Sequence, residues 1–278
     1  MLSYGTVDEL RAFLSGGRKG IELDRAALQL AALEYPGLDI RPFLEILDSH
    51  GSELRARLSK HATGAEFVRA ANSYLFSELG FVGNSADYYD PRNSCLNEVL
   101  VRRLGIPITL SVVYMEVARR LNRPVSGVGL PGHFLVRYDD GAFAAFIDPF
   151  HAGAILTPQQ CFALAREATG ARIEEDSRLL APVSARQILL RMLANLRGVY
   201  LQRRATEKAL GVVDLLLSAN PDSLDDLRVR GMLYMEMRRL TRARADFERY
   251  LRIAPRAPDR TEIAQKLQTI AHLLARMN

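Results

Sequence analysis

The spacing of hydrophobic residues predicts a mostly helical first half that leads into a small sheet. Hydrophobic residues recur every three or four positions, the period of an amphipathic helix, in residues 6–16, 21–35, 39–60 and 64–79. Two more helices are expected, from Ser94 to Leu104 and from Thr109 to Leu121. The second of these is hydrophobic on almost every side, so we expect it to be buried.

Two strand-like runs follow these helices. They are His133–Tyr138 and Ala142–Asp148, and Asp139-Asp140-Gly141 lies between them, which is typical of a β-hairpin. If the Asp-Gly pair forms a two-residue turn, His133 stands directly opposite Asp148. A four-residue loop gives the same pairing. Opposed residues share one face of the sheet, with Cβ atoms about 4.5–5.5 Å apart, so an imidazole and a carboxylate are predicted within hydrogen-bond reach.

The last third of the chain contains an internal repeat. Residues of one type recur at a spacing of 34, namely Leu193 and Leu227, Tyr200 and Tyr234, Ala209 and Ala243, and Pro221 and Pro255. This period and the order of these residue types match the tetratricopeptide repeat, a pair of antiparallel helices. In the second copy Gly231 is small where the two helices touch, and Phe247 fills the space beside it. The first copy has Arg197 and Val213 at these two positions.

Two such repeats do not bury their own faces, so we expect them to pack on the rest of the chain. A final helix from Thr261 to Met277 is predicted to cover the open end. Stacked helical repeats most often form a groove that holds another protein, so we predict a protein partner for this region. The alternative is that the helices only complete a core.

The composition is that of an ordinary globular protein. The chain has 278 residues, of which 48% are hydrophobic and 25% are charged. It contains no uncharged apolar run of about 18 residues, so we expect no membrane-spanning helix. The first nine residues have neither a basic segment nor an apolar core, so we predict no secretory signal. Cys95 and Cys161 are the only cysteines, which favours a reducing, cytoplasmic location over a disulfide scaffold.

Positive charge is concentrated at the C-terminal end. Residues 186–278 contain 18 Lys and Arg against 10 Asp and Glu. This excess could attract nucleic acid or an acidic protein surface. The arginines alternate with acidic residues, however, and no aromatic side chains lie between them as stacking platforms. This pattern indicates a solvated helix face, so we do not expect nucleic acid as a partner.

A histidine held by an aspartate supplies the base and its orienting group for nucleophilic catalysis. For His133 and Asp148 the first candidate nucleophile is Cys95, because Ser94 can cap the predicted helix and place the thiol in its first turn. The helix dipole favours the thiolate there. The alternative is that Cys95 is a small buried hydrophobic residue. Ser111 is a second, weaker candidate nucleophile, but a serine inside a helix usually bonds back to the carbonyl four residues earlier.

A metal site is a further possibility for this region. His133, Asp148 and His151 offer three mixed ligands, without two histidines four residues apart on a helix. This signal is weak, so we predict neither a metal nor a cofactor.

Five segments resemble the bacterial SirB-type family: Tyr74–Phe81, Asp87–Ser94, Arg103–Leu110, Gly129–Val136 and Ile147–Phe150. The tetratricopeptide tail belongs to the same arrangement. The resemblance implies a transglutaminase-like, papain-related core over about residues 64–172, in which a cysteine at a helix N-terminus works with a histidine and an aspartate on neighbouring strands. His133 and Asp148 match that histidine and aspartate. Pro107 stands in the cysteine position, with Ser111 one turn further on, which implies a degenerate active site.

The sequence therefore predicts an α+β protein that is mostly helical, with a transglutaminase-like core, a small antiparallel sheet and an all-helical tail. We expect a helical segment at 1–63, the transglutaminase-like domain at 64–185 and the repeats at 186–278. The predicted function is protein interaction or regulation in the cytoplasm. The alternative is a thiol hydrolase or acyltransferase that uses Cys95, His133 and Asp148 on an amide or ester, and a weaker one is nucleic-acid association through the basic tail.

Overall fold

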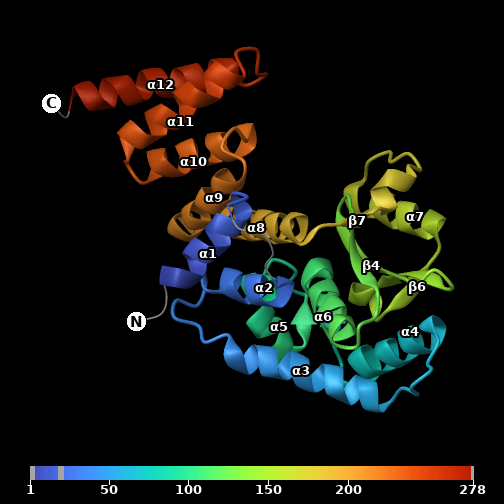
Figure 1. The fold of residues 1–278 in the computed structure, drawn as a ribbon. Helices are drawn as coiled ribbons and strands as arrows, with labels where there is room; N and C mark the ends of the chain where they lie inside the picture. Colours follow the sequence, from blue (N-terminus) through green and yellow to red (C-terminus); the bar gives the residue numbers. More distant parts are fainter. Residues whose placement is uncertain (1–3, 18–21, 277–278) are drawn as a thin grey trace. The chain divides into compact units, whose positions relative to one another are not determined.

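The computed structural model of the protein describes residues 4–17 and 22–276. The described residues fall into two compact units (Figure 1). The first comprises residues 4–7 and 22–192, and the second comprises residues 8–17 and 193–276. Residues 21 and 277, predicted ends of two helices, lie outside the described residues.

The first unit begins with helices, which are α1 (Tyr4–Leu14, whose later part belongs to the second unit), α2 (Leu23–Ala31), α3 (Arg41–Ala56) and α4 (Gly64–Asn72), followed by the π-helical turn η1 (Ser73–Glu78). Helix α4 starts at a capping box, in which Thr63 accepts a hydrogen bond from the Glu66 N–H and the Glu66 carboxylate accepts one from the Thr63 N–H. Nearly every side chain of α2 is buried.

The middle of this unit consists of β1 (Val82–Gly83), η2 (Pro91–Ser94), α5 (Leu96–Arg102), β2 (Leu104–Gly105) and α6 (Pro107–Arg120). Helix α5 is shorter than predicted at both ends. Ser94 closes the preceding 3₁₀ turn, and Cys95 has an extended backbone with φ −99° and ψ 113°. Arg103 ends α5 in the left-handed region, with φ 60°. The predicted burial of α6 is confirmed, because it packs between other helices and the sheet and most of its residues are buried.

Arg120, near the end of α6, joins three helices by ion pairs. Its guanidinium lies 2.9 Å from Asp24 on α2, 2.6 Å from Asp48 on α3 and 3.2 Å from Glu116 on α6 itself. Its side chain is only 13% exposed. Because a buried guanidinium needs acidic partners, these contacts fix α2 and α3 to the core.

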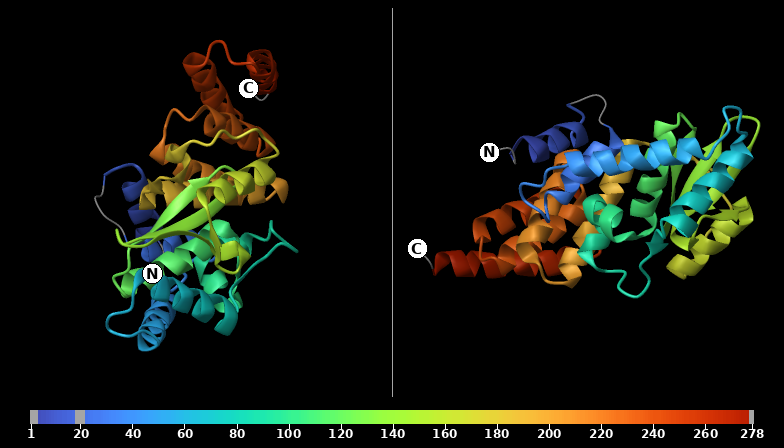
Figure 2. Two further views of the ribbon diagram at one scale, coloured as in Figure 1. Left: turned by 90° about the vertical axis from the view of Figure 1, so that its right-hand side faces the viewer. Right: turned by 90° about the horizontal axis from the view of Figure 1, so that it is seen from below.

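Five antiparallel strands form the sheet in the order β6-β5-β4-β3-β7. They are β3 (Val125–Leu130), β4 (His133–Asp139), β5 (Ala144–Asp148), β6 (Ala154–Leu156) and β7 (Pro182–Val183), and η3 (Pro149–His151), α7 (Pro158–Thr169) and η4 (Ser177–Leu180) connect the later strands. Helices α6 and α7 lie on opposite sides of the sheet (Figures 1 and 2).

The two faces of the sheet bury different sets of side chains. Val128 and Leu135 pack with Cys161 and Phe162 of α7 in one hydrophobic cluster. On the opposite face, Tyr138 contacts Phe67 of α4, with ring centroids 5.5 Å apart. This alternation is the period-two pattern of a strand that is covered on both sides.

The hairpin of β4 and β5 has a different register from the one predicted. Val136 pairs with Ile147, so the ladder is shifted by two residues from the predicted one. The Asp140 N–H donates to the Phe143 carbonyl (3.2 Å) and Gly141 has φ +83°. The turn therefore centres on Gly141 and Ala142 rather than on Asp140 and Gly141. A shift of two residues keeps every side chain on its predicted face.

The second unit is helical and contains most of α8 (Ala185–Gln202), which begins in the first unit, with α9 (Thr206–Ala219), α10 (Leu224–Glu236), α11 (Leu240–Ile253) and α12 (Arg260–Ala275). A Cβ on Gly231 of α10 would lie 2.5 Å from the Phe247 ring of α11, so only glycine allows this close approach. Arg197, which takes the place of a glycine, pairs instead with Asp225 (2.8 Å) and Asp226.

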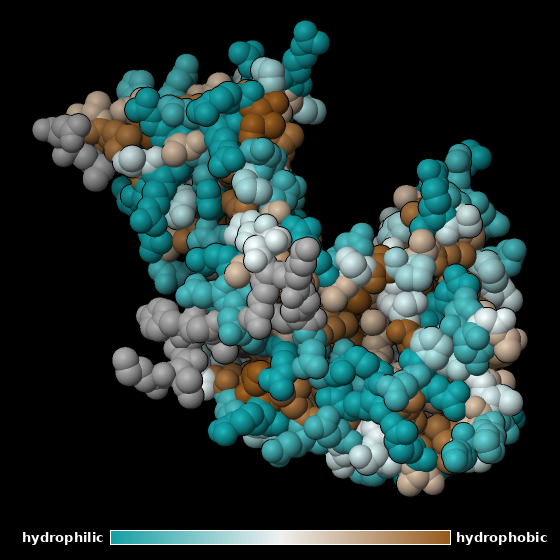
Figure 3. Space-filling view, viewed as in Figure 1, coloured by the Kyte–Doolittle hydropathy of each residue, from teal (hydrophilic) through white to brown (hydrophobic). Residues whose placement is uncertain are grey.

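Arg230 organises the charges inside this unit, since it lies 2.9 Å from Asp214 and 2.8 Å from Asp246. Hydrophilic residues predominate on the face of the repeat helices that is visible in Figure 3. No helix within residues 4–17 and 22–276 is long and apolar enough to span a bilayer.

Candidate functional site

The first residue of β4 and the last residue of β5 meet at one end of the sheet. His133 Nε2 lies 2.9 Å from Asp148 Oδ2. His133 is 6% exposed and Asp148 is 1% exposed. The two residues are diagonal neighbours in the observed register, yet they share a face because the shift is an even number of residues. The structure thus brings together the histidine and aspartate singled out in the sequence.

A third side chain joins the pair. His151 Nδ1 lies 2.7 Å from the same Asp148 Oδ2, and the two imidazole rings are stacked with centroids 5.8 Å apart. The other carboxylate oxygen, Oδ1, accepts hydrogen bonds from the N–H groups of Phe150 (3.0 Å) and His151 (3.4 Å). One oxygen of Asp148 therefore fixes the local turn, while the other contacts both histidines.

The convergence of His151 depends on the turn that follows β5. Asp148 is the N-cap residue of η3, and Ala152 ends this turn in the left-handed region with φ 53°. The Gly153 N–H then returns to the Asp148 carbonyl (2.8 Å). The sequence already offered His151 as a possible ligand beside His133 and Asp148, but it gave no signal for the left-handed alanine that ends the turn.

The surroundings of Asp148 keep it ionised. Burial opposes its negative charge, but hydrogen bonds and positive charge from His133 and His151 outweigh this effect and lower the pKa of Asp148 below its usual value. A charged carboxylate in this position orients both imidazoles.

Arg191 supports the site from α8 and was missed in the sequence. Its guanidinium donates to the backbone carbonyls of Leu130 and His133, both at 2.6 Å. Burial lowers the pKa of Arg191, and Tyr88 opposes this effect. The only signal in the sequence was an arginine in the mostly apolar run Ile188–Leu193. By holding the turn between β3 and β4, Arg191 fixes the backbone from which the His133 side chain extends.

The structure places Cys95 inside the helical layer and not on the sheet. It is the N-cap residue of α5, one position before the first turn, and it is 0% exposed. Its electrostatic neighbour is Tyr35, whose pKa is raised by burial and then by the charges of Glu98 and Cys95. The expectation of a thiol in the first helical turn was wrong, because the preceding 3₁₀ turn ends at Ser94 and delays the start of the helix.

Ser111 is also 0% exposed. Its hydroxyl has no hydrogen-bond partner among the described residues, so the expected bond to the Pro107 carbonyl is not formed. The structure therefore gives neither predicted nucleophile access to solvent.

The remaining thiol, Cys161, lies in α7 on the same face of the sheet as Asp148. Burial, together with the negative charge of Asp148, raises the pKa of Cys161 to about 11. The residue is 0% exposed. It is therefore a protonated core thiol at neutral pH.

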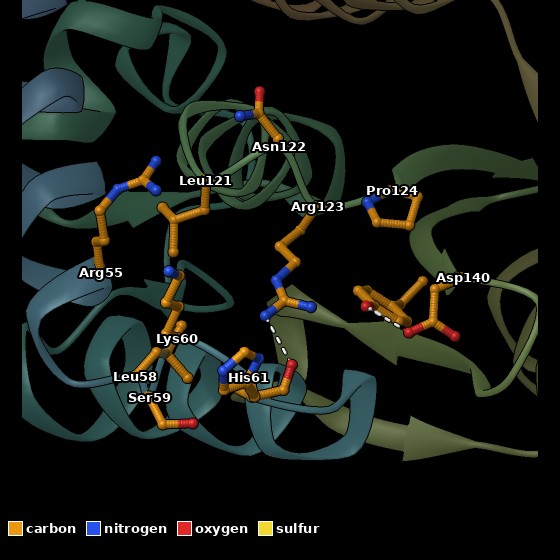
Figure 4. A pocket seen from close by; sticks show the side chains of 12 residues that line it. Arg55, Leu58, Ser59, Lys60, His61, Leu121, Asn122, Arg123, Pro124 and Asp140 are labelled. Atoms are coloured by element: carbon orange, nitrogen blue, oxygen red, sulfur yellow. Dashed lines mark hydrogen bonds between the residues drawn. The ribbon is translucent and has the colours of Figure 1, made fainter.

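A separate cavity of about 830 Å³ lies between the end of α3 and the segment after α6 (Figure 4). Basic side chains line much of it, namely Arg55, Lys60, His61 and Arg123. Arg123 donates to the Ala62 carbonyl (2.8 Å), and beside it the Tyr138 hydroxyl donates to Asp140 (2.9 Å). The cavity has no signature in the sequence, because its residues come from three separate segments.

The repeat unit has a basic cavity of its own, of about 590 Å³. It lies at the turn between α10 and α11 and is lined by Arg238, Arg239, Leu240, Thr241, Arg242 and Leu274. The Arg242 guanidinium lies over the Tyr234 ring, 5.8 Å from its centroid. An arginine held in this way can present its N–H groups to an anionic side chain.

Residues 42–194 match the transglutaminase-like superfamily, and residues 196–268 match the tetratricopeptide repeat. The first match covers more than half of the chain, and the chain belongs to the transglutaminase-like superfamily. More narrowly, it belongs to the UPF0162 proteins. It is 39% identical to the UPF0162 protein of Xylella fastidiosa strain 9a5c over 240 residues, covering 84% of this chain and 85% of the relative.

Two other relatives are matched over very different shares of their own length. A UPF0162 protein of Pseudomonas aeruginosa is 30% identical over 249 residues, covering 90% of this chain and 91% of the relative. Human F-box only protein 21 is 32% identical over 186 residues, which is 62% of this chain but 28% of the human protein. The predicted fold class, a mostly helical transglutaminase-like domain with a small antiparallel sheet and a helical repeat tail, is confirmed.

Proposed function

We propose that this protein is a non-catalytic interaction protein of the SirB type, which acts in the cytoplasm. In this proposal the repeat unit binds a protein partner, and the transglutaminase-like domain retains an orienting His–Asp pair without a working nucleophile. Two cysteines that form no disulfide are compatible with a reducing compartment.

The observation that carries this proposal is the burial of every candidate nucleophile. Cys95, Ser111 and Cys161 are each 0% exposed, so a substrate carbonyl has no route to them in this conformation. Nucleophilic catalysis requires the attacking atom and its base within hydrogen-bond reach and open to the substrate. The His133–Asp148 pair fulfils only the orienting half of that requirement.

The chemistry of the repeat cavity indicates the kind of partner. Arg238 and Arg242 have no acidic ion-pair partner among the described residues, whereas Arg228, Arg230 and Arg249 are paired with acids. Unpaired arginines beside Leu274 favour a peptide segment with acidic and apolar side chains. Because arginines such as Arg230 are neutralised internally, nucleic-acid association through this unit is the weaker alternative.

The principal alternative is a thiol hydrolase or acyltransferase that acts on an amide or ester through Cys95, His133 and Asp148. The 2.9 Å contact between His133 and Asp148 favours it, because this is the base-and-orienter arrangement that such enzymes use. It requires a conformational change that exposes Cys95.

Thiol labelling distinguishes the two proposals. We expect iodoacetamide at neutral pH to modify neither Cys95 nor Cys161 in the folded protein and to modify both in urea, as read by mass spectrometry. Cys161, which is equally buried, is the internal control. Rapid labelling of Cys95 alone, slowed by His133→Ala, would support the hydrolase instead.

Partner binding is tested with a labelled poly-glutamate peptide followed by fluorescence anisotropy. We expect the double charge reversal Arg238→Glu/Arg242→Glu to abolish binding. The matched control is the double reversal Arg252→Glu/Arg256→Glu, at two exposed positions in the last turn of α11 and just after it, which should retain it. Equal binding of the peptide by both variants would exclude this cavity as the binding site. Tighter binding of a DNA oligomer, with a steep salt dependence, would favour the nucleic-acid alternative.

A further inference from the structure

Three potential metal ligands converge at the end of the sheet. His133, Asp148 and His151 each offer one ligand atom, and these atoms all lie within 4.8 Å of one another. Both imidazoles point at the same oxygen, Asp148 Oδ2, at 2.9 and 2.7 Å. An aspartate that only orients a catalytic histidine needs one such contact. The second histidine has no role in that arrangement.

The spacing of these atoms is close to that of a metal site. In a tetrahedral Zn²⁺ site the bonds to nitrogen and oxygen are about 2.0–2.2 Å, which sets neighbouring ligand atoms about 3.3–3.5 Å apart. The two observed N–O separations are within about 0.6 Å of that spacing. A small rotation of the exposed His151 ring would admit the ion, while the backbone stays in place.

Hydrogen bonds from neighbouring groups orient the three ligand residues before a cation binds. Asp148 Oδ1 is fixed by two backbone N–H groups, and Arg191 fixes the backbone carbonyl of His133. Such contacts orient the ligands and limit the entropy lost on binding. Asp148 and His133 are buried, whereas the His151 side chain is 55% exposed. The fourth position of a bound ion would thus open to solvent on the side of His151.

We propose that His133, Asp148 and His151 form a binding site for a divalent transition-metal ion of the zinc type. Two imidazoles and one carboxylate suit zinc, whereas Mg²⁺ prefers an all-oxygen, octahedral set with several waters. The weak sequence signal is strengthened by the shared oxygen, which only the structure reveals. The proposal is independent of whether the repeat unit binds a partner.

The test uses the full chain after treatment with a chelator, titrated with Zn²⁺ in competition with a chromogenic chelator. We expect one equivalent of Zn²⁺ to bind, and Mg²⁺ in excess not to displace it. His151→Ala is the main variant, because its exposed side chain can be removed without disturbing the core. Loss of this ligand should weaken binding by at least about 100-fold, more than the cost of losing an outer contact.

Two controls separate this site from other zinc ligands. His272→Ala removes an exposed histidine of α12, and Cys95→Ala removes one of the two thiols of the chain. Both variants should bind Zn²⁺ as the wild type does. Stoichiometric binding that survives His151→Ala, or binding weaker than about 100 μM to the wild type, would overturn the proposal. Circular dichroism of each variant confirms that it is folded.

Discussion

The contact between Gly231 and Phe247 provides a sharp test of how the repeat unit is packed. Replacing Gly231 by alanine adds one methyl group whose carbon would lie 2.5, 2.8 and 2.9 Å from three atoms of the Phe247 ring. These separations are far below van der Waals contact. Phe247 is 0% exposed and its ring is rigid, so α10 and α11 must move apart.

Two opposing effects set the expected magnitude. Overpacking of a buried contact costs about 1–3 kcal/mol, whereas replacing a helical glycine by alanine stabilises by about 0.5–1 kcal/mol. The net expectation for Gly231→Ala is a loss of about 1–2 kcal/mol. The matched control is Gly198→Ala in α8, because a Cβ there meets no atom within 4 Å. This variant should gain the helical preference alone.

Hydrogen exchange read by mass spectrometry measures the effect locally. In Gly231→Ala, peptides from Leu224–Ile253 should exchange about 5–30 times faster than in the wild type, as expected for a loss of about 1–2 kcal/mol. Gly198→Ala should exchange no faster than the wild type. Adding Phe247→Leu to Gly231→Ala should recover part of the loss, since the smaller side chain relieves the contact. Exchange in Gly231→Ala that is as slow as in Gly198→Ala would refute the close approach of these helices.

Three further outcomes follow from the first unit. Burial and the charge of Asp24 raise the pKa of Glu116 to about 7, so the folded state loses stability as pH rises from the ordinary 4.5 towards 7. Glu116→Gln removes this loss. The free energy of unfolding in urea of the variant, relative to that of the wild type, should therefore rise by about 2 kcal/mol between pH 5 and pH 8. Arg191→Met should shift the imidazole NMR signals of His133 with little change in helix content, because it frees the carbonyl that Arg191 holds; unchanged signals would show that the contact is dispensable. Gly153→Ala should lower the melting temperature by several degrees, since Gly153 has φ +76° and a Cβ there would lie 2.6 Å from the Asn72 side chain; an unchanged melting temperature would contradict that crowding.

The sequence predicted that His133 and Asp148 meet, and this prediction held although the predicted register of the hairpin was wrong. The turn was placed one residue too early, and the ladder moved by two residues as a result. Side chains alternate between faces with a period of two, so an even shift leaves both residues on one side. An odd shift would have separated them. The prediction was therefore right about the shared face of the sheet and wrong about the register of the two strands.

Other features depend on local backbone states that the sequence does not reveal. His151 reaches Asp148 because the 3₁₀ turn η3, capped by Asp148, follows β5 directly. This turn ends at Ala152 in a left-handed conformation, which alanine rarely signals. Likewise, Ser94 was expected to cap a helix but closes a 3₁₀ turn, which leaves Cys95 extended and buried. Long regular periodicities, such as the 34-residue repeat, were readable because many residues contribute to each.

The ion pairs of Arg120 bear on how this protein should be divided for experiments. A fragment that starts at Gly64 would retain this guanidinium but lose Asp24 and Asp48, its counter-ions on α2 and α3. The arginine would then be left beside Glu116 alone, which already shares its charge with Arg119. Recombinant fragments of the transglutaminase-like region should therefore begin before Leu23. Helices α2 and α3 are better treated as part of the folded domain than as a removable extension.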